Sequence, residues 1–277
     1  MRGLIERAGN WVFANGLSGD FEEVKRALER AGSSLSLVAR LDQYYADFDH
    51  VSPYQAARKA AFAPQEVAPS TSVVLSRGQK VEVHVMAATT ASGYRAERMS
   101  GGLNRPETSG YSPCLRMGDM VFMAGQLARD ASGKIAARGV AEETDYILRH
   151  RVVPALEAAG SAADLVLKAQ AYVTGDIADF RRAWSGFFGA DLPPTALVPV
   201  PHPAFLSREA TVEINIIAAH AWARSRIRRT GKTRRFDGLV FTDSAERREH
   251  VDAALAGARK VRILDFGGVV DVWGYAG

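Results

Sequence analysis

The stretch Val152 to Tyr172, VVPALEAAGSAADLVLKAQAY, matches the stretch Val24 to Tyr44, VKRALERAGSSLSLVARLDQY, at an offset of 128 residues. In both copies a helical pattern of apolar residues ends at Ala-Gly-Ser, and a strand-like apolar run follows. The glycine suits the end of a helix, because it adopts left-handed dihedral angles without strain. A helix and a strand that occur twice in this way predict a duplicated unit.

Three further blocks recur in the same order around this pair. They are Gly9–Gly16 with Gly118–Gly125, Pro69–Val74 with Pro193–Val198, and Val81–Ala88 with Val212–Ala219. Each copy therefore has a short strand, a helix, a strand, a second helix and two closing strands. This order predicts an α+β fold of two tandem domains, each a mixed sheet with helices packed on one face. We place these domains at residues 1–100 and 108–222.

The composition is that of an ordinary globular protein, with 47% hydrophobic and 24% charged residues among 277. Disordered, collagen-like and coiled-coil chains are excluded. No apolar run has the length of a membrane span, and the first residues lack the apolar core of a signal peptide. A single cysteine, Cys114, agrees with a reducing compartment. The sequence therefore predicts a soluble, cytoplasmic protein with no membrane association.

The net charge of +4 belongs to the C-terminal part of the chain. Residues 223–277 contain 12 Lys/Arg and 7 Asp/Glu, whereas the remainder contains 23 and 24. We interpret residues 223–277 as a basic extension, with a helix within Thr242–Ala258 and a strand at Val261–Leu264. The arginine run between Arg224 and Arg235 is read as a solvated linker or a surface for an acidic partner, with a grip on nucleic acid phosphates as the alternative.

The repeated blocks resemble the Rid (YjgF-like) family of enamine/imine deaminases, most clearly from Gly110 to about Ala219. The segments that carry the resemblance are Gly110–Pro113, Gly118–Gln126, Pro154–Gly160 and Val212–Ala218. The resemblance implies a chorismate-mutase-like fold for each domain, and a trimer with clefts between neighbouring domains. It also implies a hydrolase that converts an enamine or imine into a carbonyl compound and ammonia without a metal or an organic cofactor.

Within this resemblance, Glu213 corresponds to the carboxylate of the closing strand and is expected to move protons as an acid/base catalyst. Apolar residues flank it, so its side chain points to the opposite face of the strand from theirs. The alternative is a surface carboxylate or one paired with an arginine. Tyr111 corresponds to a pocket wall that supplies a hydroxyl, and Ala124 and Gly125 to a strand end whose backbone holds water.

The carboxylate-binding arginine of the family has no counterpart in this sequence. Thr195 stands at its place, and Thr71 does so in the first copy. Arg116 and Arg208 are therefore candidates to hold a substrate carboxylate, and His202, on a proline-flanked loop, is a candidate to reach the pocket. Tandem chains with such changes are similar to deaminases of ring-cleavage products. The predicted substrate is accordingly a small unsaturated amino acid of the 2-aminomuconate class.

The missing arginine leaves other interpretations open. A Rid-like protein that binds a small carboxylate without catalysis retains the cleft and loses the reaction. A nucleic-acid-associated protein would use the basic extension, although no recognised nucleic-acid motif surrounds it. The six histidines have no metal-ligand spacing, so no metal site is predicted.

Three expectations concern the whole chain. We expect a homo-oligomer, with a trimer as the leading arrangement, because the clefts of the family lie between neighbouring domains. We expect deletion of residues 224–277 to leave the two domains folded. The second copy alone carries Gly110–Pro113 before its first strand, so catalysis is assigned to it. Glu213 is then expected to matter more than Glu82, its counterpart in the first copy.

Overall fold

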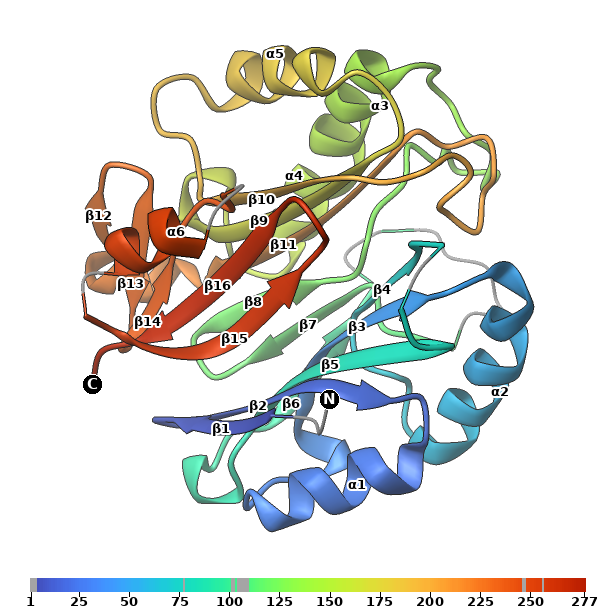
Figure 1. The fold of residues 1–277 in the computed structure, drawn as a ribbon. Coiled ribbons are helices and arrows are strands. Elements are labelled where there is room, and N and C mark those ends of the chain that lie inside the picture. The colour runs from blue at the N-terminus through green and yellow to red at the C-terminus, as the bar shows by residue number, and fades with distance from the viewer. Residues whose placement is uncertain (1–3, 77, 101–102, 104–109, 246–247, 256) are drawn as a thin grey trace.

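Three β-sheets meet at a common core in the computed structural model, which describes residues 4–76, 78–100, 103, 110–245, 248–255 and 257–277 (Figure 1). Helices cover the outer faces of the sheets. The predicted α+β class is confirmed, but the structure has three sheets rather than two. No helix among the described residues is long and apolar enough to cross a membrane.

The first sheet has the strand order β1-β2-β5-β3-β4, with β3 and β4 parallel and the other pairs antiparallel. Its elements are β1 (Leu4–Ala8), β2 (Trp11–Ser18), α1 (Phe21–Arg30), β3 (Val38–Tyr45), α2 (Val51–Phe62), β4 (Ser70–Val74) and β5 (Val81–Ala88). Helix α1 begins after Asp20, whose carboxylate accepts a hydrogen bond from the Glu22 N–H. Both helices pack their apolar residues on the sheet. This sheet and its helices are called the first unit.

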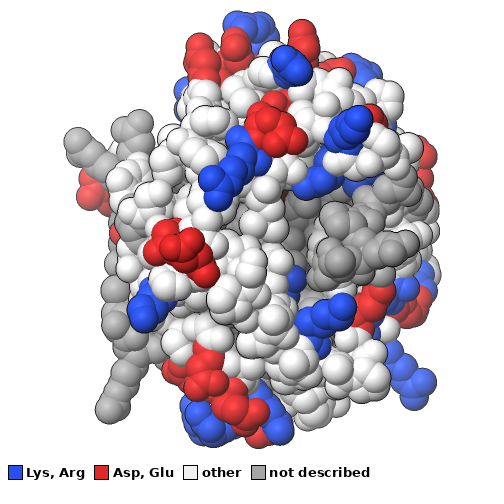
Figure 2. Space-filling model, turned by 90° about the vertical axis from the view of Figure 1, so that its right-hand side faces the viewer, with Lys and Arg blue, Asp and Glu red and all other residues white. Residues whose placement is uncertain are grey.

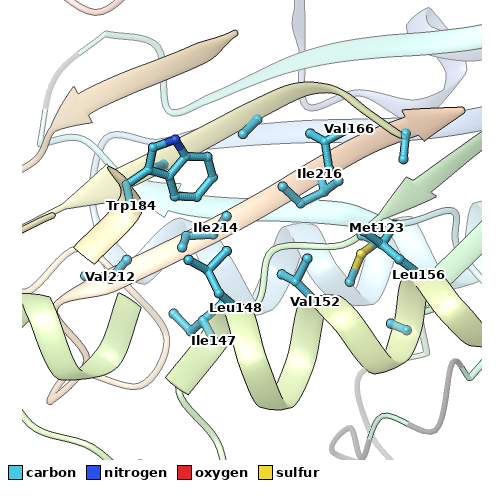
Figure 3. Close-up of a cluster of buried hydrophobic side chains, with 14 of the residues drawn as sticks. Met123, Ile147, Leu148, Val152, Leu156, Val166, Trp184, Val212, Ile214 and Ile216 are labelled. Atoms are coloured by element: carbon cyan, nitrogen blue, oxygen red, sulfur yellow. The ribbon is translucent and has the colours of Figure 1, made fainter. Parts of the chain in front are cut away.

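The second sheet has the order β10-β9-β11-β8-β7-β6. Its elements are β6 (Ala96–Met99), β7 (Cys114–Met117), β8 (Met120–Met123), α3 (Val140–Ile147), the π-helix η5 (Leu148–Val152), α4 (Val153–Ala158), β9 (Val166–Val173), α5 (Ile177–Phe188), β10 (Thr195–Pro199) and β11 (Val212–Ala219). Helices α3, η5 and α4 follow one another without a break. In Figure 3, Leu148, Val152 and Leu156 of η5 and α4 point toward the sheet face that carries Ile214 and Ile216 of β11. Strand β6 joins this sheet, although the sequence placed residues up to 100 in the first domain. This sheet and its helices are the second unit.

The third sheet, with the order β12-β13-β14-β16-β15, lies in the segment interpreted as an extension. Its elements are β12 (Arg228–Thr230), β13 (Thr233–Phe236), β14 (Leu239–Phe241), α6 (Arg248–Leu255), β15 (Arg259–Asp265) and β16 (Val270–Tyr275). Short 3-10 helices elsewhere are η1 (Leu35–Leu37), η2 (Phe48–His50), η3 (Thr90–Ser92), η6 (Ala163–Leu165) and η7 (Ala221–Arg226). Helix α6 and β15 lie where a helix and a strand were predicted. This sheet and α6 are the third unit.

The third unit repeats the topology of the first. The order β13-β14-β16-β15 corresponds to β1-β2-β5-β3, with a helix between the second and third strands in chain order. Each unit contains a two-residue hairpin turn followed by a strand that holds a buried Val-Phe pair; the phenylalanines are Phe13, Phe122 and Phe241. The third unit is thus a shortened third copy, which lacks the second helix and the strand that follows it.

The arginine run is structured rather than a linker: it begins in η7 and continues into β12 and β13 of the third unit. Arg224 pairs with Asp164, Arg226 with Asp119, and Arg234 with Asp191. The side chain of Arg234 is 2% exposed. These pairs connect the run to the second unit.

The central core is built from all three sheets. It contains Phe13, Phe122, Phe241 and Trp273, together with Ala39, Leu167 and Val261. The last three residues each occupy a β-bulge at the same place in their sheets. A bulge turns two successive side chains toward the same face, so the residue after each bulge also points inward. The structure therefore contradicts the expectation that residues 224–277 are dispensable, because their removal would expose this core.

The residues that follow the three bulges are cations, Arg40, Lys168 and Arg262, each at most 2% exposed. Asp42 pairs with both Arg40 and Arg262, while Asp271 pairs with Lys168. Burial opposes ionisation of Asp42, but the charges of Arg40 and Arg262 lower its pKa below the usual value. Each aspartate thus compensates at least one cation in the interior.

Gln170 connects the Arg40–Asp42–Arg262 group to the Lys168–Asp271 pair. It accepts a hydrogen bond from Arg40 at 2.6 Å and donates one to Asp271 at 3.2 Å. The three cations, the two aspartates and Gln170 form one buried polar network to which every sheet contributes. We call it the central ion network.

We expect Asp42→Ala to lower the free energy of unfolding by about 3–5 kcal/mol, because two arginines lose their buried counter-charge. Chemical denaturation at pH 7 measures the change. Asp179→Ala, which removes an exposed pair with Arg182, is the control and should cost less than about 1 kcal/mol. Equal losses in the two variants would contradict the importance of the central ion network.

One chain supplies all three sheets around the core, which bears on the expected trimer. The inner face of each sheet is already covered by the other two. The exposed large hydrophobic residues that the structure describes, Leu4, Leu206 and Trp222, belong to three different segments. We therefore expect a monomer of 30.0 kDa in light scattering at micromolar concentration. A stable trimer under those conditions would show that a further interface exists.

Candidate active site

The edge of the first sheet meets the second unit along strand β4. The Gly125 N–H donates to the Ser70 carbonyl at 3.0 Å, and Val67 forms a parallel bridge with Tyr111. Gln126 exchanges two backbone hydrogen bonds with Ile214 of β11. These contacts place Tyr111, the strand end after β8, and the start of β11 beside one edge strand, in a region we call the first junction.

Glu213 lies on β11 in this junction and is 6% exposed. Its neighbours Val212 and Ile214 pack on the helices, so Glu213 points to the opposite face, as the strand alternation predicted. Burial raises the pKa of Glu213 to about 8, although a hydrogen bond from the Ser72 N–H opposes the shift. The carboxyl is therefore protonated at neutral pH and has a pKa suited to proton transfer.

Because Gly125 has no side chain, there is room beside it for the Glu213 carboxyl. A Cβ atom at residue 125 would lie 2.6 Å from Cδ of Glu213, so any side chain there would displace the carboxyl. Ala124, the preceding residue, is fully buried and its carbonyl accepts a hydrogen bond from Gln126. The strand end that the resemblance indicated thus lies against Glu213 in this structure.

Tyr111 also belongs to the first junction. Burial raises its pKa above the usual value, and the Glu213 charge raises it further, while nearby Arg129, Arg151 and Arg58 lower it. These opposing influences show that the Tyr111 hydroxyl lies within electrostatic range of one acid and three guanidinium groups. The hydroxyl therefore remains protonated and available as a hydrogen-bond donor.

Within the described residues, two of the three arginines have only neutral hydrogen-bond partners. Arg58, on α2, donates to the side-chain oxygens of Gln43 at 2.7 Å and Ser70 at 3.1 Å, and its buried Nε has no hydrogen-bond partner. Arg129 donates to the Gly133 carbonyl and to Ser207. Figure 2 views the molecule from the side on which α2 lies and shows a hollow there with Lys and Arg side chains near it. The junction therefore combines a neutral buried acid with Arg58 and Arg129, neither of which has a carboxylate partner in the part of the chain that the structure describes.

The structure places two of the predicted site residues elsewhere. Arg116 pairs with Glu97 and contacts His220 at 3.1 Å, just after the C-terminal end of β11, whereas Glu213 lies at the start of that strand. Thr195 lies at the start of β10 and receives the Ser244 N–H of the third unit at 3.1 Å. It therefore lies at the corresponding junction between the second and third units.

The strand register also corrects the alignment of Thr195. Ala169 pairs with Thr195 in β9–β10, as Leu41 pairs with Ser70 in β3–β4. The counterpart of Thr195 in the first unit is thus Ser70, one residue before Thr71. In the first junction, the guanidinium of Arg58 is hydrogen-bonded to this same Ser70.

The loop after β10 holds the two remaining candidates. His202 is exposed, and Arg208 packs on Phe48 of the first unit, with its Cζ 4.3 Å from the ring centroid. The Ala204 carbonyl accepts a hydrogen bond from Val74 of β4 at 2.8 Å, so the loop crosses to the first unit. Neither side chain has a described contact with Glu213.

Sequence reasoning missed Arg58, Arg129 and Arg151. Arg58 shares a buried stripe of α2 with Val51, Tyr54 and Phe62, at spacings of three and four residues. An arginine on an apolar helical stripe is a usable signal, because a buried cation needs a polar partner. Arg129 has no such pattern, since it lies in a loop. Cys114 is fully buried, and burial raises its pKa to about 12, which does not favour a nucleophile.

No group of three His, Cys, Asp or Glu residues within the described ranges could hold a metal ion. The site chemistry available in the first junction is that of a protonated carboxyl, a phenol, backbone groups and guanidinium cations.

Residues 102–220 match the family model described as endoribonuclease L-PSP. A RutC family protein of Sinorhizobium fredii is 32% identical over 110 residues, which cover 39% of this chain and 84% of that protein. A RutC family protein of Pyrococcus horikoshii is 29% identical over 119 residues, or 42% of this chain and 91% of the other. The crystal structure of yeast Mmf1 is 20% identical, with a TM-score of 0.41, and covers 45% of this chain and 98% of Mmf1.

The family-model match falls on the second unit, which contributes Glu213, Tyr111 and Gly125 to the first junction. The match with the Sinorhizobium protein extends over 84% of that relative at 32% identity. The range of the family model includes the segments that first suggested the resemblance. The chain belongs to the Rid (YjgF-like) family.

Proposed function

We propose that the chain is a deaminase that hydrolyses the enamine or imine of a small, unsaturated, anionic amino acid to a carbonyl compound and ammonia. The observation that carries the proposal is the buried Glu213, protonated at neutral pH, beside two arginines with neutral partners. Membership of the Rid family supports the same reaction class. The reaction is proposed to occur at the first junction.

Arg58 and Arg129 are proposed to bind the substrate carboxylates. The family arginine is absent from β4, but Arg58 reaches Ser70 on that strand from α2. A guanidinium group binds a carboxylate through two parallel hydrogen bonds, and this geometry fixes the orientation of the substrate. Two such cations favour a substrate with two carboxylates, and compounds of the 2-aminomuconate class are dicarboxylates. The proposal does not include Arg116, Arg208 or His202, because none of these side chains has a described contact with Glu213.

Glu213 is proposed to move every proton in the reaction. Its carboxyl first protonates the enamine carbon, and the nitrogen lone pair forms a C=N bond. The resulting carboxylate takes a proton from a water whose oxygen attacks the carbon of C=N. Glu213 then protonates the nitrogen, which leaves as ammonia while the hydroxyl proton returns to the carboxylate and the C=O bond forms. The net reaction consumes one water and regenerates protonated Glu213.

Other groups of the first junction are proposed to orient the substrate and the attacking water. Backbone groups of Ala124 and Gly125 lie beside the carboxyl, and the Tyr111 hydroxyl is a protonated donor. A buried site strengthens each of these polar interactions relative to water. Ammonia release from 2-aminoacrylate and 2-aminomuconate generated in situ, with purified protein and no added metal, tests the proposed activity.

A non-catalytic binding protein is the second candidate, because neither β4 nor β10 carries the family arginine. Such a protein would show ligand-induced shifts in melting temperature without turnover. The basic run does not favour a nucleic acid partner, since several of its arginines are paired with aspartates of the same chain.

We expect Glu213→Gln to lower turnover by about 10²-fold or more, the usual effect of losing a general acid/base. Glu82→Gln is the matched control, because Glu82 is the counterpart of Glu213 and is 37% exposed beside His84. Steady-state assays of ammonia release compare the two. Unchanged turnover in Glu213→Gln, or a larger loss in Glu82→Gln, would contradict the assignment.

Arg58→Gln is expected to raise KM for a dicarboxylate substrate by about tenfold, the effect of losing one charge-assisted hydrogen bond. Its kcat should change less, since Arg58 does not transfer protons. Arg58→Lys should restore part of the affinity by keeping the charge. If Arg58→Gln leaves KM unchanged in a folded protein, the carboxylate binds elsewhere.

The raised pKa of Glu213 predicts two linked pH effects. The value of kcat/KM should fall as pH rises through about 8, because the protonated acid is lost. The folded-state pKa lies above the ordinary value of 4.5, so the stability contribution of this carboxyl is present at low pH and is lost as pH rises to about 8. The melting temperature of Glu213→Gln minus that of the wild type should therefore increase between pH 5 and 8. A constant difference would show that Glu213 is ionised in the folded state.

A further inference from the structure

The second and third units meet in a second junction that repeats the first. The Ser244 N–H donates to Thr195 at 3.1 Å, as the Gly125 N–H donates to Ser70 at 3.0 Å. Ala245 bridges to Val270, as Gln126 bridges to Ile214. The backbone of the second junction is therefore built in the same way, and its side chains can be compared position by position.

In the second junction, other residues stand in place of Glu213 and Arg58. Since Ile214 corresponds to Val270, the counterpart of Glu213 is Val269. Helix α5 buries Phe180 and Trp184 at the places where α2 buries Tyr54 and Arg58. Trp184 thus stands in place of Arg58. With Val269 in place of the proton-transfer group, the second junction cannot support the chemistry proposed for Glu213.

A cavity of about 670 Å³ occupies this second junction. That volume lies within the range of pockets that bind small molecules. Its apolar lining includes Phe180, Trp184, Leu192 and Leu197, and the rings of Phe180 and Trp184 lie 5.2 Å apart with 22° between their planes. A cavity with polar groups on one part of its lining and a stacked pair of rings in its apolar part suits a planar aromatic ligand that carries a polar group.

Some polar groups of the cavity already have partners in the chain, and one does not among the described residues. Asp243 accepts the Thr195 N–H at 2.7 Å and pairs with Lys232 at 3.1 Å, and Ser244 accepts the Leu197 N–H at 3.2 Å. These groups are used to hold β10 against the third unit. Arg181, on α5, also lines the cavity, is exposed and has no ion pair or hydrogen bond within the described part of the chain. A cation beside an aromatic wall is suited to a ligand that carries a carboxylate.

We propose that the cavity between α5 and the third unit is a second, non-catalytic binding site for an aromatic carboxylate. The ring lies against Phe180 and Trp184, and the carboxylate binds Arg181. The site does not depend on the reaction proposed at Glu213. It arises because the same junction occurs twice in one chain and only one copy carries the acid.

Isothermal titration calorimetry of the full chain with 2-naphthoate tests the proposal. We expect saturable binding of one 2-naphthoate per chain, and Arg181→Glu should weaken it by about tenfold. Arg182→Glu is the control, because Arg182 is the next residue on α5, pairs with Asp179 and does not line the cavity. The uncharged analogue 2-naphthamide should bind the wild type and Arg181→Glu about equally.

Two further variants locate the bound probe. Trp184→Leu should abolish binding of both compounds, with circular dichroism to show that the fold is kept. Arg58→Gln and Glu213→Gln should leave binding of 2-naphthoate unchanged, even where they reduce ammonia release. Absence of saturable binding in the wild type, equal losses in Arg181→Glu and Arg182→Glu, or loss of binding in Arg58→Gln would each overturn the proposal.

Discussion

The central ion network holds the three sheets in one arrangement. The buried cations Arg40, Lys168 and Arg262 would be costly in the interior without compensation, and Asp42 and Asp271 supply the opposite charges there. Each aspartate receives a donor from a different sheet from its own, because Arg262 reaches Asp42 and Lys168 reaches Asp271. Apolar packing tolerates small displacements, whereas hydrogen-bonded ion pairs require defined positions. The network thus fixes how the sheets meet, and the junctions between them inherit that geometry.

The candidate active site depends on this arrangement because no single unit contains it. The first unit supplies the edge strand β4 and the guanidinium of Arg58, and the second supplies Glu213 and Gly125. Burial between the units raises the pKa of Glu213, so the same packing that holds the sheets together also sets the protonation state of the proposed catalyst. Stability and reactivity are in this sense coupled through one interface.

The sequence predicted what is local and repeated. The repeated helices and strands of the first two units follow from their apolar patterns, whereas β1, β6 and β7 were not predicted. The position of Glu213 on the face opposite Ile214 follows from strand alternation. The third unit was missed because little of the repeat remains in it beyond Leu239-Val240-Phe241 and its hairpin turn. Arg116 and Arg208 were reasonable candidates by residue type, but Arg116 pairs with Glu97 on the neighbouring strand β6, and Arg208 packs on Phe48 of the first unit. Which cation reaches the acid depends on contacts between units, and these cannot be read from the pattern of any one segment.

Three related units within one polypeptide remove a restriction that identical subunits impose. In a symmetric assembly every substitution appears at each interface at once, so a change that improves one site alters all of them. Here Glu213, Val269 and Glu82 occupy corresponding positions in the three units, and Arg58 and Trp184 do so in two. Covalent linkage of the units lets each junction acquire its own chemistry while the shared core stays the same. In such a chain one junction can carry the proposed reactive centre, and the remaining junctions are available for selection toward other ligands.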